Sequence, residues 1–143
     1  MKVGFTGTRH GMQNAQSEIF TKLLTRLRPT EFHEGDCIGA DDQATDIVKW
    51  IWKHLVKVVR HPPTVTDHQA NNPNFDEIRE PNTHFARNRA IVDETEALVA
   101  TPADMEEPPY GDGGTWYTVR YARKLGRPIY IIWPDGSIRE ENT

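Results

Sequence analysis

Short runs of apolar and β-branched residues alternate with amphipathic segments along this chain, and that alternation restricts its fold more than any other feature. Five runs have the length and composition of strands: residues 2–5, 31–34, 55–59, 97–100 and 129–133. Strands that alternate with helices form a parallel sheet covered by helices. We therefore expect an α/β protein, Rossmann-like, with a mostly parallel five-stranded sheet and helices on both faces.

Four helices are expected between these strands. They cover residues 12–27, the residues after 42 up to about 54, residues 84–94, and the residues from the glycine turn at 113–114 to about 125. Pro29 ends the first helix, and Gly126 is suited to cap the last one. Residues 61–83 break the rhythm with four prolines. For this segment we expect a lid that orders when a ligand binds.

The size and charge of the chain limit the class of protein to which it can belong. Its 143 residues suit one domain over residues 1–143, with 134–143 as a loose polar tail. The net charge of −4 argues against nucleic acid as a partner. A single cysteine excludes an internal disulfide and fits a reducing cytoplasm. No apolar run approaches the roughly 20 residues of a membrane span, so no membrane partner is expected.

The loops after the strands carry the unusual residues. In a parallel sheet these loops, at 6–11, 35–42, 61–83 and 101–115, meet at the carboxyl edge, where ligands bind. The loops at 6–11 and 101–115 hold glycines between a strand and a helix, where backbone N–H groups and the helix dipole favour an anion. The expected partner is a nucleotide-type small molecule.

The first two loops offer phosphate and sugar ligands. Gly7, Thr8 and Arg9 provide close backbone approach, a hydroxyl and a guanidinium fork; the alternative is a plain turn whose arginine pairs with a carboxylate. Gly35, Asp36, Gly39 and Asp41 form the second set. Asp41 either stabilises a helix N-terminus or accepts a ribose hydroxyl. Cys37 beside them is better explained as a small buried thiol than as a nucleophile.

The later segments complete the candidate ligand-binding set. Arg87, Asn88 and Arg89 fall within one helical turn, and because residues two apart do not share a face, only one arginine points to the site; we favour Arg89. Gly113, Gly114 and Thr115 form the phosphate-type turn. Trp116 or Tyr117 either stacks on a base or packs in the core.

No metal or cofactor is expected. The six histidines show no metal-ligand spacing, and neither H-E-x-x-H nor C-x-x-C occurs. Asp36, Asp41 and Asp42 could gather Mg²⁺, but a solvated acidic turn explains them as well.

These motifs resemble those of the SLOG superfamily, which includes the lonely-guy (LOG) phosphoribohydrolases and the Rossmann-like domain of DNA-processing protein A. The matching stretches, which extend to about Trp133, are Thr6-Gly7-Thr8-Arg9, Gly35-Asp36, Gly39-Ala40-Asp41, Arg87-Asn88-Arg89, Ala97-Leu98-Val99-Ala100 and Gly113-Gly114-Thr115-Trp116. The resemblance implies a Rossmann-like fold, a nucleotide or nucleotide derivative at these loops, and a homodimer. Nucleoside 2-deoxyribosyltransferases look similar through the last helix and strand.

One position departs from the catalytic members of these families. The LOG hydrolases have a glutamate three residues after the threonine of the glycine loop, and this chain has Thr118 there. Threonine cannot act as a carboxylate nucleophile or stabilise an oxocarbenium ion by charge. Glu106, Glu107 and Asp112 in the preceding loop are the substitutes that the sequence offers, with Arg89 to hold phosphate.

Three functions are compatible with these residues. The first is a non-catalytic module that senses or sequesters a phosphorylated nucleoside such as an ADP-ribose-type ligand. The second is an enzyme that hydrolyses or exchanges the N-glycosidic bond of a nucleotide. The third is a nucleic-acid-binding domain, against which the acidic balance counts. The missing glutamate ranks the binding module first.

Overall fold

The computed structural model describes residues 1–111 and 113–143. The elements follow in the order β1 (Lys2–Gly7), α1 (Asn14–Leu27), β2 (Glu31–Glu34), α2 (Ala40–Trp52), η1 (Lys53–Leu55), β3 (Lys57–Arg60), β4 (Glu77–Ile78), α3 (His84–Asp93), β5 (Ala97–Thr101), α4 (Gly114–Lys124), β6 (Ile129–Ile132) and β7 (Ile138–Glu141). Helices and strands thus alternate as the sequence pattern predicts.

The strands form one sheet in the order β4-β3-β2-β1-β5-β6-β7. All neighbours are parallel except β6 and β7, which are antiparallel. From β1 the chain builds outward to one side through β2, β3 and β4, and then crosses to β5 on the other side. The boundary between β1 and β5 is therefore the switch point, where α/β sheets hold their ligands.

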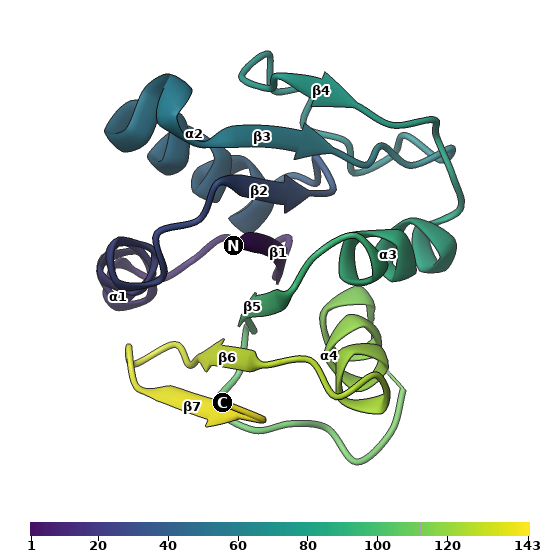
Figure 1. Cartoon of the computed structure of the whole chain (residues 1–143). Coiled ribbons are helices and arrows are strands. Elements are labelled where there is room, and N and C mark those ends of the chain that lie inside the picture. Colours follow the sequence, from purple (N-terminus) through teal and green to yellow (C-terminus); the bar gives the residue numbers. More distant parts are fainter. Residues whose placement is uncertain (112) are drawn as a thin grey trace.

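The expected α/β class and the helices on both faces are confirmed, whereas the strand count is corrected from five to seven. Figure 1 shows α1 and α2 on one face of the sheet and α3 and α4 on the other. β4 has only two residues, too few to give a periodic pattern. The loose tail expected at 134–143 was also wrong, because Ile138–Glu141 pairs with β6 as an antiparallel strand.

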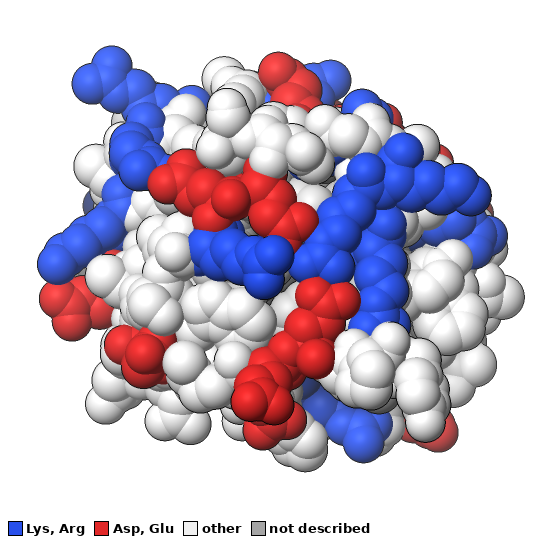
Figure 2. Space-filling view, turned by 90° about the horizontal axis from the view of Figure 1, so that it is seen from below, with Lys and Arg blue, Asp and Glu red and all other residues white. Residues whose placement is uncertain are grey.

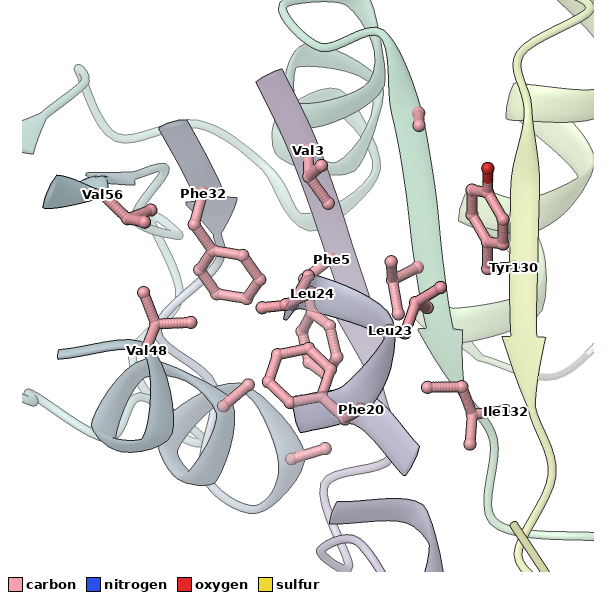
Figure 3. Close-up of a cluster of buried hydrophobic side chains, with 14 of the residues drawn as sticks. Val3, Phe5, Phe20, Leu23, Leu24, Phe32, Val48, Val56, Tyr130 and Ile132 are labelled. Carbon is pink, nitrogen blue, oxygen red and sulfur yellow. The ribbon is translucent and has the colours of Figure 1, made fainter. Parts of the chain in front are cut away.

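Each face of the sheet has its own apolar core. Under α1 and α2, Phe5, Phe20 and Phe32 pack with ring centroids 5.4–5.9 Å apart, the middle of a larger cluster (Figure 3). Under α3 and α4 a smaller cluster includes Val119 and Ile131. Burial of these side chains stabilises the sheet that carries the loops, at roughly 1.5–3 kcal/mol for each large residue.

Residues 61–83 are attached to the body at several points. The β4 strand extends the sheet beside β3, and isolated bridges join Cys37 to Gln69 and Pro63 to Asn82. Asp36 accepts hydrogen bonds from the backbone N–H of Asn71 at 3.2 Å and of Asn72 at 3.1 Å. The segment therefore forms a wall beside the carboxyl edge of the sheet. That it orders further when a ligand binds stays a prediction.

Among the described residues, every helix is too short or too polar to cross a bilayer.

Candidate functional site

Two adjoining cavities lie at the carboxyl ends of the central strands. The inner cavity has a volume of about 320 Å³ and receives residues from all four loops that follow strands, including Gly7, Cys37, His68 and Gly114. The outer cavity, of about 460 Å³, lies between the 6–11 loop and the proline-rich 102–109 segment. Arg9 and Thr115 line both cavities. The two cavities therefore form one cleft, large enough for a ligand with two parts.

The N-terminus of α4 opens onto this cleft. Gly113 is the N-cap residue at φ 89; among the residues that the structure describes, no side chain caps the helix, and its first turn holds no acidic residue. The first backbone N–H groups of the helix, from Gly114 and Thr115, lie beside the cavities. A helix start without a capping side chain presents unsatisfied donors and a positive dipole end to an anion.

The α2 helix differs, because its own sequence neutralises its N-terminus. Its first turn contains Asp41 and Asp42. Oδ2 of Asp41 accepts hydrogen bonds from the backbone N–H of Gly35 at 3.1 Å and of Cys37 at 3.3 Å. Of the two glycine loops, the one at α4 is therefore the one that can receive an external phosphate.

Arg9 stands at the junction of the two cavities. Its side chain is exposed, and Nη1 lies 2.8 Å from Nε2 of His68, which is part of the 61–83 wall. Thr8 is buried, and its Oγ1 accepts the N–H of His10 at 3.1 Å, so the hydroxyl hydrogen remains available to a ligand. Arg9 thus brings a positive charge to the edge of the α4 N-terminus.

The tight start of α2 explains the glycine that precedes it. A Cβ on Gly39, which has φ +86, would lie 2.3 Å from the carbonyl oxygen of Arg9. A Cβ on Gly7 would lie 2.4 Å from Thr101 Oγ1 and 2.5 Å from the Ala40 side chain. These glycines allow the 6–11 loop and the start of α2 to pack in direct contact, which holds Arg9 in place.

The structure selects Arg87, rather than the favoured Arg89, for the cavity. Arg87 is buried and lines the inner cavity, while Arg89 donates from Nη1 to the hydroxyl of Tyr117 at 2.6 Å on the α3–α4 surface. The guanidinium of Arg87 is already used within the protein: Nη1 donates to the carbonyls of Gly35 at 2.6 Å and His61 at 3.1 Å. Arg87 therefore shapes the cavity, and Arg9 supplies the charge free to meet a ligand.

Asn88 is oriented by its neighbour. Its Oδ1 accepts from Nε of Arg87 at 2.7 Å, which directs the amide nitrogen toward Gly114. A Cβ on Gly114 would lie 3.1 Å from that nitrogen, so glycine leaves the space open. Asn88 thus presents two N–H donors beside the start of α4.

The pKa values of two groups in the wall of the inner cavity, the Asp41 carboxyl and the Cys37 thiol, are shifted upward. Burial and the nearby charge of Glu34 raise the pKa of Asp41 to about 7, so this cavity wall carries a carboxyl group that holds its proton near neutrality. Burial and the charge of Asp41 raise the pKa of Cys37 to about 12. Cys37 is therefore an unreactive thiol that packs in the cavity wall.

Gly35 and Asp36 lie behind the cavity wall. The Arg87 guanidinium packs directly on Gly35, where a Cβ would lie 2.5 Å from Nη1. Asp36 is buried and holds the 69–72 segment by the hydrogen bonds described above. Both residues position the site, and neither reaches its free space.

The residues after the glycine turn are mostly committed to the fold. Trp116 is buried with its ring 5.9 Å from that of Trp133, and one edge faces the outer cavity. Thr118 is fully buried and its hydroxyl donates to the carbonyl of Gly114 at 2.6 Å. At the place of the hydrolase glutamate, this chain therefore has a side chain that completes a helical turn.

The described acidic residues that were expected to substitute for the hydrolase glutamate, Glu106 and Glu107, do not point to one place in the cleft. Glu107 binds Arg123 through two hydrogen bonds of 2.8 and 2.9 Å, which lower its pKa and keep it ionised. Glu106 is exposed at the outer cavity. Asp112 lies outside the described residues.

Sequence reasoning missed an aromatic residue at the mouth of the inner cavity. Phe85 lines this cavity, is 53% exposed, and stacks on Tyr117 with centroids 4.2 Å apart. An exposed phenylalanine in the first turn of a helix beside a charged motif was the available signal. Its free ring face is suited to stack on a planar ligand group.

Several solved structures share the fold of this chain. A molybdenum cofactor binding protein from Rippkaea orientalis matches with a TM-score of 0.66 and 16% identity over 93% of this chain and 77% of that one. The protein TM1055 matches with a TM-score of 0.61 and 18% identity over 90% and 72%. DNA processing protein A (DprA) from Streptococcus pneumoniae matches with a TM-score of 0.64 and 17% identity over 91% of this chain but only 49% of its own.

Comparisons with protein-family models and with curated proteins give no match. The chain therefore shares the α/β fold of these neighbours. Its function has to be argued from its own cleft.

Proposed function

We propose that this chain is a binding module for a phosphorylated nucleoside-type ligand, such as one of the ADP-ribose type. The observation that carries the proposal is the meeting of the uncapped α4 N-terminus with Arg9 at the junction of the two cavities. Phosphate is the common biological group that such a helix start binds, and an arginine fork adds charge-assisted hydrogen bonds. Arg87 and Glu107, which also line the cleft, are paired inside the protein, whereas Asp104 and Glu106 are exposed at the outer cavity, on the far side from α3.

The inner cavity fits the nucleoside part of such a ligand. Asn88 offers amide donors and Asp41 offers a carboxyl group, the types of partner that sugar hydroxyls require. Phe85 provides a ring face at the mouth on which a base can stack. The outer cavity leaves room for a further phosphate or sugar beyond Arg9. The molybdenum cofactor binding protein, by its name, uses a similar fold to bind a small ligand, which agrees with this assignment.

A nucleic-acid partner is less suited to this surface. Figure 2 shows basic and acidic side chains next to one another on the face seen from below in Figure 1, where a group of basic side chains right of the centre borders on acidic ones. Binding to a phosphate backbone favours a basic surface that acidic side chains do not interrupt. We therefore propose a small ligand, and gel shifts at low salt provide the comparison.

The test is to identify what the protein binds. Native mass spectrometry of the purified chain shows whether a nucleotide co-purifies, and calorimetry with nucleoside mono- and diphosphates, ADP-ribose and cyclic ADP-ribose gives affinities. We expect Arg9→Ala to weaken binding about 10- to 100-fold, since a charge-assisted hydrogen bond contributes about 1.5–3 kcal/mol. The matched control is Arg26→Ala, which removes an exposed arginine at the end of α1. No binding at high micromolar concentrations of any of these nucleotides contradicts the proposal.

A second function, cleavage of the N-glycosidic bond, is favoured by Asp41 alone. A carboxyl group with pKa near 7 in a cavity wall can donate a proton to a departing base. Arg89, which was expected to hold phosphate, lies away from the cavity, and Glu107, one of the expected carboxylates, is ionised and paired. Asp41 is therefore the acid in this second proposal. Release of free base from a nucleoside monophosphate, abolished by Asp41→Asn, supports this function. A nucleotide that stays intact after prolonged incubation with the protein contradicts this second function.

We also propose a homodimer in the cytoplasm. Trp50 on α2 and Leu55 on η1 are large apolar side chains that are 82% and 71% exposed. Cys37, the single cysteine, is a free thiol, which fits a reducing compartment. Light scattering at high protein concentration tests the dimer, and a monomer mass contradicts it.

A further inference from the structure

A cluster of two histidines and a glutamate lies away from the cleft. His33 is on β2, His61 directly follows β3, and Glu94 directly follows α3. The two rings are almost fully buried, whereas Glu94 is partly exposed. One potential ligand atom from each residue lies within 4.8 Å of the others. None of the three residues lines either cavity.

The hydrogen bonds of this cluster form a chain that runs from one carboxylate to another. Nε2 of His33 lies 2.9 Å from Oε1 of Glu31, and Nδ1 of His33 lies 2.8 Å from Nε2 of His61. Nδ1 of His61 then faces Oε2 of Glu94 at 3.8 Å. The chain has three contacts between its four groups.

Each neutral imidazole carries one N–H hydrogen, so the two rings supply hydrogens for only two of the three contacts. Glu31 requires the hydrogen on Nε2 of His33, so Nδ1 of His33 accepts from Nε2 of His61. Nδ1 of His61 is then a bare lone pair that faces a carboxylate oxygen. A lone pair and a carboxylate repel each other unless a cation lies between them. The arrangement of these atoms therefore favours one additional positive charge between Nδ1 of His61 and Oε2 of Glu94.

We propose that this cluster is a binding site for a divalent transition metal ion of the zinc type, held by His33, His61 and Glu94. The two nitrogens that carry no hydrogen, Nδ1 of each ring, and Oε2 of Glu94 are the donors. Two imidazoles and one carboxylate form a donor set that zinc prefers. Zinc ligands at about 2.0–2.1 Å lie about 3.3 Å apart in a tetrahedron. Coordination requires the His61 ring to move, because the Nδ1 lone pair of His33 is directed at Nε2 of His61, and the ion then replaces the hydrogen bond between the rings.

The surroundings already have the form of a metal site. Glu31 receives the outer N–H of His33, the arrangement that orients a ligating imidazole and raises its basicity. Arg79 donates to Oε1 of Glu94 at 2.9 Å, which fixes that carboxylate and leaves Oε2 toward His61. Arg79 is also balanced by Glu77 at 3.1 Å. Because Glu94 is partly exposed, water can reach the site and complete the coordination shell.

The sequence conceals this site because its ligands are 28 and 33 residues apart. Parallel pairing of β2 and β3 places His33 and His61 together, and the end of α3 adds Glu94. A bound ion would join two strands and a helix end. Since the His61 carbonyl accepts from Arg87, the ion would also stiffen the residue that shapes the cleft.

The experiment uses the whole chain freed of metal by a chelator. We expect calorimetry with Zn²⁺ to give one site at low micromolar affinity or tighter, and Co²⁺ to give the visible absorption of a tetrahedral site. Glu94→Gln should weaken Zn²⁺ binding at least tenfold, and Glu31→Gln about tenfold. His54→Gln, which changes an exposed histidine of η1, should leave the affinity unchanged.

Nitrogen NMR of the wild-type imidazoles keeps the proposal falsifiable if a variant fails to fold. On addition of Zn²⁺, Nδ1 of His33 and Nδ1 of His61 should shift as metal-bound nitrogens. The proposal is overturned if Zn²⁺ leaves both resonances unchanged, if it shifts only exposed histidines, or if Glu94→Gln binds as tightly as the wild type.

Discussion

Replacement of Arg60 by methionine provides a strong test of the electrostatics behind the cleft. Arg60 and Glu34 are 2% and 0% exposed, with Nη2 of Arg60 donating to Oε1 of Glu34 at 2.6 Å. The same carboxylate accepts from Thr45 Oγ1 at 2.9 Å and from the Asp36 N–H at 2.8 Å. Arg60 also donates to the carbonyl of Asn72 in the 61–83 segment. It is therefore the cation of a buried network that fixes the cavity wall.

The expected loss is large because methionine leaves a buried carboxylate without its cation. Removal of one partner of a buried ion pair costs about 3–5 kcal/mol. That is a substantial share of the roughly 5–15 kcal/mol by which domains are stable. With a urea m-value of about 2 kcal/mol per molar, the unfolding midpoint should fall by about 1.5–2.5 M at pH 8.

The loss should also depend on pH in one direction. Burial raises the pKa of Glu34, and the hydrogen bond from Arg60 opposes that rise. Without Arg60 the folded pKa rises further, so the folded state holds a proton that the unfolded state releases above about pH 4.3. Stability then decreases as the pH increases from there, by at most about 1.4 kcal/mol per pH unit. The variant should be close to the wild type near pH 4 and weakest at pH 8.

Urea unfolding followed by fluorescence and circular dichroism at pH 4.5, 6 and 8 measures this difference. The surface pair of Arg26 and Glu140, whose side chains are 56% and 40% exposed, provides the control: Arg26→Met should cost at most about 1 kcal/mol. The double variant Arg60→Met with Glu34→Gln should be more stable than Arg60→Met alone at pH 8. A loss for Arg60→Met that matches the control, or that is the same at every pH, would refute the reasoning.

Three further predictions concern the cleft itself. Because the folded pKa of Asp41 is about 7 and its unfolded pKa is about 3.9, the wild type should lose stability relative to Asp41→Asn as the pH rises from 4 to 7; parallel urea profiles would contradict this. Gly39→Ala should cost more than about 2 kcal/mol because its Cβ would meet the Arg9 carbonyl at 2.3 Å, whereas Gly126→Ala, at φ +72 in open space, should cost about 1 kcal/mol; equal losses in thermal unfolding would rule out the close approach. With a pKa of about 12, Cys37 should react with iodoacetamide at pH 8 at least about a hundredfold more slowly than in urea, and equal rates would disprove its burial as a neutral thiol.

The alternation of strands and helices could be predicted from the sequence because each long element has its own hydrophobic period. The strands at 31–34 and 97–101 and the helix at 84–93 lie within one or two residues of their predicted bounds. The two missed strands have other causes. β4 consists of two residues, and β7 is polar and is held by pairing with β6 and by the contact of Arg123 with Glu141. Such strands depend on tertiary contacts that no local pattern contains.

The site was predictable to the level of loops and not to the level of side chains. Parallel topology brings the four loops together, and glycines and threonines mark them. The choice between Arg87 and Arg89 depends on which way α3 is rotated on the sheet, which the weak hydrophobic pattern of that helix does not define. The His33–His61–Glu94 cluster depends on strand register in the same way, since a shift of one residue would turn His33 to the other face.

The division between paired and available polar groups is what distinguishes this cleft from an ordinary strand-to-helix junction. Buried polar groups must find partners, and here Arg87, Asp36 and Glu107 have found theirs within the protein. The donors left toward the cleft are the α4 N-terminus, the Arg9 guanidinium and the Asn88 amide, which come from different elements and meet at one place. Because all three are donors, they favour an acceptor-rich ligand, and phosphate, the group that we propose, satisfies that condition with the charge that a helix N-terminus favours.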